Sequence, residues 1–352
     1  ADAFLVLFPY KGKGELVTYC EAYSRALNGF IVSREQNYQL ELRSGICCVE
    51  DSDASDINSL LDRANMALKT IKVKGAAQWK FYDHTMRDKL LREKDLEIRM
   101  EKALADGEFL VYIQPKYWVG TRALAGGEAL VRWKSPDQGF LSPGEFIPLF
   151  EKNRFIVKLD QFMFTSVCGL LRQWLDAGIE PRPLSVNVSR MQFHTPDFVE
   201  RYIRIKSQYA IPDGLLELEF TESIFFDNVA LLSSAVHELR RAGIKCSIDD
   251  FGAGYSSLNV LKALPVSVLK LDGMFFRTAK DDEQAKIVIR NIMRMAGELK
   301  MATVAEGVET HEQVAFLETT GCDIIQGYVF ARPMPAAEFT ELLAGEGGHA
   351  ER

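Results

Sequence analysis

Carboxylate and amide side chains follow the short apolar runs in the chain beyond residue 108. Glu219 and Glu222 lie in ELEFTES, and Asp249 and Asp250 lie in SIDDFG. The other polar residues that follow such runs are Glu128, Arg132, Asn187, Lys270, Asp272, Glu306, Glu309 and Gln326. Each of them alone is most simply a helix N-cap or an ion-pair partner, and Glu309 fits that role best. Many carboxylates converging on one place would repel each other and lose hydration, and bound cations relieve both problems.

Oxygen ligands without clusters of Cys or His favour Mg²⁺, Mn²⁺ or Ca²⁺ over zinc. There are more carboxylates than one ion needs, which favours two ions ~3.5–4 Å apart, bridged by adjacent aspartates such as Asp249 and Asp250. Such a pair can clamp a phosphodiester and activate a water for in-line attack. Lys270 would hold or deprotonate that water, or neutralise the pentavalent oxyanion. Arg132 is suited to hold a second phosphate by a bidentate contact.

The elements that must position these residues alternate between strands and helices. The β-rich runs are 109–117, 127–133, 184–189, 216–221, 245–251, 268–271, 302–305 and 323–328. Amphipathic helical segments, such as 230–242 and 283–299, lie between most of them. This alternation predicts an α/β fold with a mainly parallel sheet. Eight strands over ~240 residues predict a closed (β/α)₈ barrel of the TIM type, whose active-site face lies at the C-terminal ends of the strands.

The first 105 residues have a different pattern. We predict strands at 1–9 and 38–49 and helices at 21–27 and 56–71, with 79–82 closing this part. The segment 84–105 is a highly charged helix, which we interpret as a connector, with a solvated surface helix or a partner helix as alternatives. The predicted organisation is an N-terminal α+β partial domain at 1–83, the connecting helix at 84–105, the barrel at 106–345 and a tail at 346–352.

Composition excludes several classes of protein. The chain has 352 residues, and its 42 Lys and Arg against 49 Asp and Glu give a net charge of −7, which argues against a nucleic-acid binder. No apolar run reaches the ~20 residues of a membrane span, and no secretory leader is visible, so we expect no membrane contact from this chain. The six cysteines show no CxxC pairing, which predicts free thiols and a cytoplasmic location. A membrane anchor upstream in a longer protein stays open.

An ordered series of motifs beyond residue 108 resembles the EAL domain, the bacterial phosphodiesterase specific for cyclic-di-GMP. The motifs are Gln114-Pro115, Glu128-Ala129-Leu130 with Val131-Arg132-Trp133, Ser142-Pro143, Val186-Asn187-Val188-Ser189, Glu219 to Ser223, Asp249 to Leu258, Leu269 to Asp272, Ala305 to Thr310 and Gln326-Gly327-Tyr328. The tripeptide alone would be a weak signal, whereas the ordered series over about 230 residues is specific for one barrel family. The resemblance implies a barrel whose first strand is antiparallel, two Mg²⁺ or Mn²⁺ ions, and hydrolysis of cyclic-di-GMP to linear pGpG.

The resemblance also implies roles for single residues. It implies that Glu128, Asn187, Glu219 and Asp249 hold the first cation, and that Asp249, Asp250 and Glu306 hold the second. Lys270 resembles the residue that orients the attacking water, and with Glu128 and Glu306 it forms the expected catalytic set. Glu222 resembles the anchor of the loop after Asp250. The remaining matches are substrate contacts or supporting positions: Gln114, Leu130, Arg132, Asp272, Gln326 and Glu309.

Two positions depart from the family pattern. Ala253 replaces a common threonine, which removes a hydroxyl that could order the loop after Asp250. Ile113 replaces the tyrosine of a YQP motif, a change expected to alter packing. Because no acidic catalytic position is altered, we favour an active enzyme, expected as a homodimer through the barrel. The alternatives are an idle cyclic-di-GMP receptor that signals by binding and, by fold analogy, an enolase-like enzyme.

The N-terminal part resembles the second half of a GGDEF domain, the diguanylate cyclase family. The matching residues are Ser44-Gly45-Ile46, Asp62 to Leu68, Lys72 and Gly75. Ala1 to Phe4 would then occupy the end of the family motif, with Ala3 in place of a catalytic glutamate. Without that acid we expect no cyclase activity, and we interpret this part as a degenerate regulatory or packing module.

Overall fold

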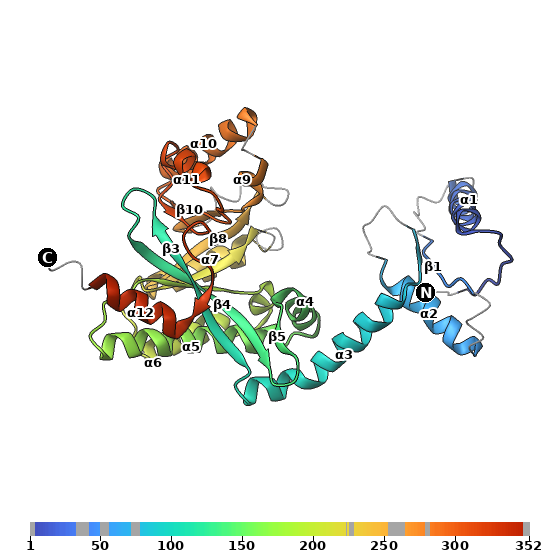
Figure 1. Cartoon of the computed structure of the whole chain (residues 1–352), viewed down its shortest axis with the longest axis horizontal. Helices are drawn as coiled ribbons and strands as arrows, with labels where there is room; N and C mark the ends of the chain where they lie inside the picture. Colours follow the sequence, from blue (N-terminus) through green and yellow to red (C-terminus); the bar gives the residue numbers. More distant parts are fainter. Residues whose placement is uncertain are drawn as a thin grey trace. The chain divides into compact units, whose positions relative to one another are not determined.

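A computed structural model of the chain describes residues 4–32, 42–49, 56–71, 78–222, 224, 229–252, 265–278 and 282–347. The chain divides into two compact units, Ala1–Ile98 and Arg99–Arg352 (Figure 1). Helix α3 (His84–Ala105) includes the boundary between the units and has the bounds predicted for the charged helix. Among the described residues, no helix is long and apolar enough to cross a membrane.

The first unit contains a small parallel sheet. The unit contains α1 (Lys13–Val32), β1 (Ser44–Ile46), α2 (Ile57–Lys69) and β2 (Trp79–Phe81), and β1 and β2 form the sheet. Helix α2 packs so closely on β1 that a Cβ on Gly45 would lie 2.0 Å from the carbonyl oxygen of Ala64. The predicted strand at 1–9 is wrong for residues 4–9, which have no regular structure. The strand predicted at 38–49 is β1 alone where the structure describes it, and residues 1–3 and 38–41 lie outside the described ranges.

The second unit is a barrel. Within the described residues, eight strands close in the order β3, β11, β10, β9, β8, β7, β6 and β4, with β4 paired back to β3. Their bounds are β3 (Phe109–Trp118), β4 (Leu124–Ser135), β6 (Leu184–Asn187), β7 (Leu216–Thr221), β8 (Ile244–Phe251), β9 (Val268–Leu271), β10 (Ala302–Ala305) and β11 (Ile324–Ile325). Strand β3 is antiparallel to both of its neighbours in this ring, and the other pairs are parallel. The predicted barrel with an antiparallel first strand is confirmed.

Two further short strands lie outside the predicted set. Strand β5 (Gly139–Leu141) pairs with β4, and β12 (Met334–Pro335) pairs with β3. Each is only two or three residues long and depends on an already formed edge for its partner. Their formation therefore follows from the tertiary structure, since a segment this short has no recognisable periodicity of its own.

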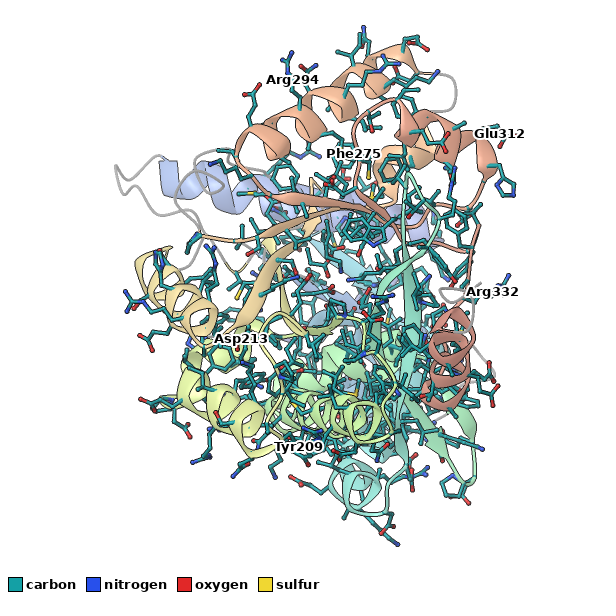
Figure 2. All side chains as sticks on the ribbon, turned by 90° about the vertical axis from the view of Figure 1, so that its left-hand side faces the viewer. Tyr209, Asp213, Phe275, Arg294, Glu312 and Arg332 are labelled. Carbon is teal, nitrogen blue, oxygen red and sulfur yellow. The ribbon has the colours of Figure 1, made fainter. Side chains whose placement is uncertain are left out.

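Helices surround the barrel. They are α4 (Pro143–Asn153), α5 (Ile156–Asp176), α6 (Phe198–Gln208), α7 (Val229–Arg241), α9 (Met274–Thr278), α10 (Glu283–Glu298), α11 (His311–Glu318) and α12 (Ala336–Gly347), with the 3₁₀ helix η1 (Arg190–His194). In Figure 1, α9, α10 and α11 lie on one side of the barrel and α5, α6 and α12 lie on the opposite side. Arg294 of α10 and Glu312 of α11 are exposed on the outer surface (Figure 2). The helices thus bury their inner faces against the strands.

Local sequence explains these elements. In α5, Leu159, Met163, Val167 and Leu171 recur at helical spacing and are buried in the core. Helix α11 begins with a capping box in which Thr310 Oγ1 accepts a hydrogen bond from the backbone N–H of Gln313, and the Gln313 side chain accepts one from Thr310. In the strands, by contrast, residues that face the helices alternate with residues that face the barrel interior. In β7 the apolar residues are buried among the helices, whereas Glu217 and Glu219 have the opposite parity and face the barrel interior.

Candidate active site

A completely buried ammonium group lies at the centre of the barrel mouth. The Lys270 nitrogen Nζ lies 2.5 Å from Glu219 Oε2, 3.0 Å from Asp249 Oδ1, 2.6 Å from Glu306 Oε1 and 3.7 Å from Glu128 Oε2. We call these four carboxylates, with Lys270, the acidic cage. The sequence analysis placed all five residues in one site, and the structure brings them together.

The strand register explains why these residues meet. Glu128, Glu219, Asp249 and Lys270 occupy inward positions of β4, β7, β8 and β9, and Glu306 directly follows β10. Neighbouring parallel strands end at similar heights, as shown by the pairing of Asn187 with Glu219 and of Thr221 with Asp249. The strand ends therefore bring all of the cage carboxylates to the same edge of the barrel.

Two amides hold Glu128, and a third amide, Gln114, contacts one of them. Asn187 Nδ2 donates a hydrogen bond of 2.7 Å to Glu128 Oε1, and Gln326 Nε2 donates one of 2.6 Å to Glu128 Oε2. Gln326 Nε2 also lies 3.2 Å from Gln114 Oε1, and Gln114 Nε2 donates to the carbonyl of Ala331. Four of the predicted site residues thus form one hydrogen-bonded chain that fixes both oxygens of Glu128.

Asp249, Asp250 and Glu306 form a second group of oxygens. One carboxylate oxygen of each lies within 4.8 Å of the others. Asp250 has a left-handed backbone with φ 54°, and its N–H donates a hydrogen bond of 2.9 Å to Asp249 Oδ1. Aspartate tolerates this conformation better than most residues, but it remains uncommon and marks a locally constrained site. The backbone conformation turns Asp250 so that its carboxylate joins the other two.

The start of the loop after Asp250 is held by Glu222. Glu222 Oε2 accepts a hydrogen bond of 3.0 Å from the N–H of Gly252. Gly252 has φ +92°, and a Cβ there would lie 2.2 Å from the ring of Phe275, so only glycine fits. Ala253 and the loop up to residue 264 lie outside the described residues. Ile113, the other departure, is completely buried in the core.

Other predicted residues lie around the cage rather than in it. The Arg132 guanidinium donates to its neighbour's carbonyl and lies over the ring of Tyr112 at 5.5 Å. Leu130 pairs with Tyr112 across β3 and β4 and is partly buried. Asp272 Oδ1 accepts a hydrogen bond from Met274 N at the start of α9. Glu309 is exposed, and its backbone N–H donates to the side chain of Gln313.

A second buried lysine, Lys116, was not among the predicted site residues. Its Nζ donates hydrogen bonds of 2.9 Å to Glu219 Oε1 and 2.7 Å to Ser185 Oγ. Glu219 is therefore held by one ammonium group at each oxygen. The available sequence signal was the period of two in β3, which puts Lys116 on the same face as Gln114. A lysine at an inward position of a barrel strand needs a buried counter-charge.

Burial and neighbouring charges shift the pKa values of the cage residues. Burial alone would raise the pKa of Glu219, but the ammonium groups of Lys116 and Lys270 hold that pKa at about 2. Burial, with repulsion from neighbouring carboxylates, raises the pKa of Glu128 and of Asp249, and that of Glu306 well above its usual value. Burial would lower the pKa of Lys270, but the four surrounding carboxylates hold it well above its usual value. The four carboxylates of the cage thus outnumber the two ammonium groups of Lys270 and Lys116.

The donor set fits divalent metal ions. The group of three consists of carboxylates alone, and the neighbouring side chains of Glu128, Asn187 and Glu219 add carboxylate and amide oxygens. All six cysteines are free thiols, as predicted, and none of them belongs to this group. Hard oxygen ligands of this kind suit Mg²⁺ or Mn²⁺. A bound cation would offset the repulsion among these acids.

Several known proteins are similar in sequence to this chain. The family model described as "EAL domain" matches residues 98–333. The bifunctional diguanylate cyclase/cyclic di-GMP phosphodiesterase MucR of Pseudomonas aeruginosa is 30% identical over 344 residues, which are 97% of this chain and 50% of MucR. The cyclic di-GMP phosphodiesterase NbdA of the same organism is 34% identical over 292 residues, which are 83% of this chain and 37% of NbdA.

A solved structure is also similar to this chain in fold. The PaMucR phosphodiesterase in complex with c-di-GMP aligns with a TM-score of 0.66 and 35% identity, covering 70% of this chain and 99% of that one. The chain therefore matches almost the whole of that solved structure, although it spans half or less of the length of MucR and NbdA.

Proposed function

This chain belongs to the EAL domain family, and from that premise we propose that it hydrolyses cyclic-di-GMP to linear pGpG with the help of two divalent cations, Mg²⁺ or Mn²⁺. The observation that carries the proposal is the acidic cage, in which carboxylates from β4, β7, β8 and the end of β10 surround Lys270. An arrangement that only stabilised the fold would not require so many buried carboxylates around one ammonium group. A site for phosphodiester hydrolysis requires both the acids and the lysine.

The proposed ligand sets follow the two groups of oxygens. Glu128, Asn187, Glu219 and Asp249 would hold the first cation, and Asp249, Asp250 and Glu306 would hold the second. When bound, the two ions would neutralise the phosphodiester and make a water molecule more nucleophilic. The three-residue group supports the second set, since its oxygens already lie within 4.8 Å of one another. The hydrogen bond from Asn187 to Glu128 supports the first set, since it places two of the proposed donors side by side.

Lys270 would orient the attacking water. Its Nζ lies among the donors of both proposed cation positions, so its N–H groups can reach a water molecule placed there. Because its pKa is raised, Lys270 stays protonated, and it is better suited to orient the water and stabilise developing negative charge than to remove a proton. Glu128 and Glu306 complete the proposed catalytic set by holding the two ends of the site.

Residues around the cage would hold the substrate. Arg132 would contact the phosphate that is not attacked, and Gln114 and Leu130 line the same wall formed by β3 and β4. Gln326 would act on the same side, since it bonds both Gln114 and Glu128, and Asp272 would act from the start of α9. Glu222 would anchor the loop after Asp250 through its bond to Gly252, and Glu309 would support the segment after β10.

The test is incubation of the purified chain with cyclic-di-GMP and Mg²⁺ or Mn²⁺, followed by chromatographic separation of the nucleotides. We expect linear pGpG, and no product when the metal is chelated. Tight binding of intact cyclic-di-GMP without any product would instead favour the idle receptor. If the chain neither binds nor hydrolyses cyclic-di-GMP, both functions are excluded.

The remaining assignments concern the chain outside the cage. We propose that residues 1–83 are the C-terminal half of a degenerate GGDEF-like domain, joined by the helix at 84–105 to the barrel at 106–345 and the tail at 346–352. The match to a cyclase/phosphodiesterase over 97% of the chain supports this organisation. We further propose a cytoplasmic protein that forms a homodimer through the barrel.

A further inference from the structure

Lys116 lies next to Glu219 of the acidic cage, and no other charged group of the site belongs to the same strand. It lies on β3, the antiparallel strand, and it is 6% exposed. Its ammonium group bonds Glu219 Oε1 and Ser185 Oγ, whereas Lys270 occupies Glu219 Oε2. Both oxygens of one proposed metal ligand are thus paired with lysines.

The inner face of β7 explains why a charge is needed at this place. Glu217 lies two residues before Glu219 on the same face and is also buried. Among the described residues, Glu217 Oε1 has no hydrogen-bond partner. Of these two buried glutamates, Glu219 forms ion pairs with Lys116 and Lys270, and Glu217 adds a second buried carboxylate to the same face of β7. A buried carboxylate left without a counter-charge is strongly destabilising.

A divalent cation bound beside Glu219 would supply the same positive charge. Lys116 and such a cation would stabilise the same carboxylate and would repel each other. The more fully Lys116 neutralises Glu219, the less the protein gains from the cation. Protein stability and metal affinity are linked, because a cation that binds the folded state stabilises that state.

We propose that Lys116 is a built-in counter-ion of the acidic cage, which stabilises the protein without metal and lowers the affinity of the cage for divalent cations. This inference rests on the metal site of the proposed function, but not on the substrate. It assigns to Lys116 a role that a merely structural lysine does not have: its removal makes the stability of the protein depend more strongly on metal.

The test compares Lys116→Met with the parent chain and with Lys206→Met. Lys206 is a matched control, since it is 7% exposed and bonds Asp213 and the carbonyl of Ala242, remote from the cage. Thermal unfolding of each protein is measured in EDTA and in saturating Mn²⁺, and the dissociation constant of Mn²⁺ is measured by titration calorimetry.

We expect Lys116→Met to lower Tm in EDTA by about 5–10 °C, and by less than half as much in saturating Mn²⁺. The Mn²⁺ dissociation constant should fall at least about tenfold. Lys206→Met should lower Tm equally in both conditions and leave the dissociation constant within about twofold of the parent value.

Three results would overturn the inference. They are an equal loss of Tm in both conditions for Lys116→Met, a weaker affinity for Mn²⁺, and a parent chain that Mn²⁺ does not stabilise. If Lys116→Met folds only with Mn²⁺, the inference is supported in its extreme form. If it folds in neither condition, Lys116→Gln replaces it, with the same expected direction. Failure of the proposed function is separate, because it would appear as a parent chain that binds Mn²⁺ but leaves cyclic-di-GMP intact.

Discussion

Oxygen Oδ1 of Asp249 lies 3.0 Å from the ammonium nitrogen of Lys270. The same oxygen accepts the hydrogen bond from the N–H of Asp250, and the Asp249 carboxylate is one of the three acids that can share a cation. Asp249 is thus the point at which the lysine and the proposed metal ligands meet. Changes at these two residues should have different kinetic consequences.

Replacing Asp249 should abolish turnover. Asp249→Ala removes a carboxylate common to both proposed ligand sets, so we expect kcat to fall by more than ~10³-fold. Steady-state hydrolysis of cyclic-di-GMP, with circular dichroism to check folding, measures this. Glu128→Ala should behave in the same way. Asp282→Ala, which removes the N-cap of α10, serves as the control and should keep normal turnover. Near-normal turnover by folded Asp249→Ala would refute the two-cation assignment.

Replacing Lys270 should affect the chemical step more than binding. Lys270→Met keeps the length of the side chain but removes the ammonium group, so kcat should fall by ~10²-fold or more while KM changes little. The measurement is a full kinetic profile at saturating metal. An effect confined to KM would show that Lys270 holds the substrate rather than the water.

Loss of the Glu222 contact should raise the metal requirement. Glu222→Ala removes the acceptor of the Gly252 N–H, and this frees the backbone next to Asp250. We expect the Mg²⁺ concentration for half-maximal rate to rise by about 10-fold, the lower end of the effect of losing a group that orients a ligand. Glu222→Gln keeps an oxygen acceptor and is the matched control. If Glu222→Ala matches the parent in rate and metal requirement, another group anchors the loop.

Asp160 should make the stability of the barrel depend on pH. Burial raises the pKa of Asp160 to about 7, even though Ser189 N and Gln192 Nε2 donate hydrogen bonds to it. The folded protein therefore binds this proton more tightly than the unfolded chain, whose aspartate has a pKa of about 3.9. The stabilisation is complete below pH 4 and is lost as the pH rises towards 7.

The corresponding variant is Asp160→Asn, which keeps a neutral acceptor at this place. Its Tm should exceed that of the parent at pH 8 by about 4 °C or more, and should come within about 2 °C of it near pH 4.5. Asp176→Asn changes an exposed aspartate of the same helix and should leave the pH dependence unaltered. Parallel Tm curves for the parent and Asp160→Asn would contradict a pKa of about 7 for Asp160.

Much of this site was predictable from sequence because its residues end strands. A run such as LELEFT combines a period of two with a polar residue at its end, so both the strand and the direction of Glu219 follow from local pattern. The barrel closure follows from the number of such runs. Lys116 was missed because it lies inside a strand, where a single lysine usually indicates a solvent-facing position.

Other differences have a similar origin. Residues 4–8 form an apolar run that predicts a strand, yet a strand needs a partner, and these residues have no regular structure. Asp250 was predicted as a ligand, but its left-handed backbone coincides with a register shift of β8 between Ile248 and Phe251 and has no signature in residue type alone. Strands β5 and β12 form only because β4 and β3 present edges to them.

The central claim is that the acidic cage breaks a phosphodiester bond and does not merely bind the molecule that contains it. A single-turnover assay tests this most directly. Purified chain in excess over cyclic-di-GMP is mixed with Mn²⁺, quenched over time and separated into its nucleotides. We predict conversion of all bound cyclic-di-GMP to linear pGpG, its arrest by EDTA and its absence in Asp249→Ala. Intact cyclic-di-GMP that stays bound to the parent chain throughout the time course would contradict the claim.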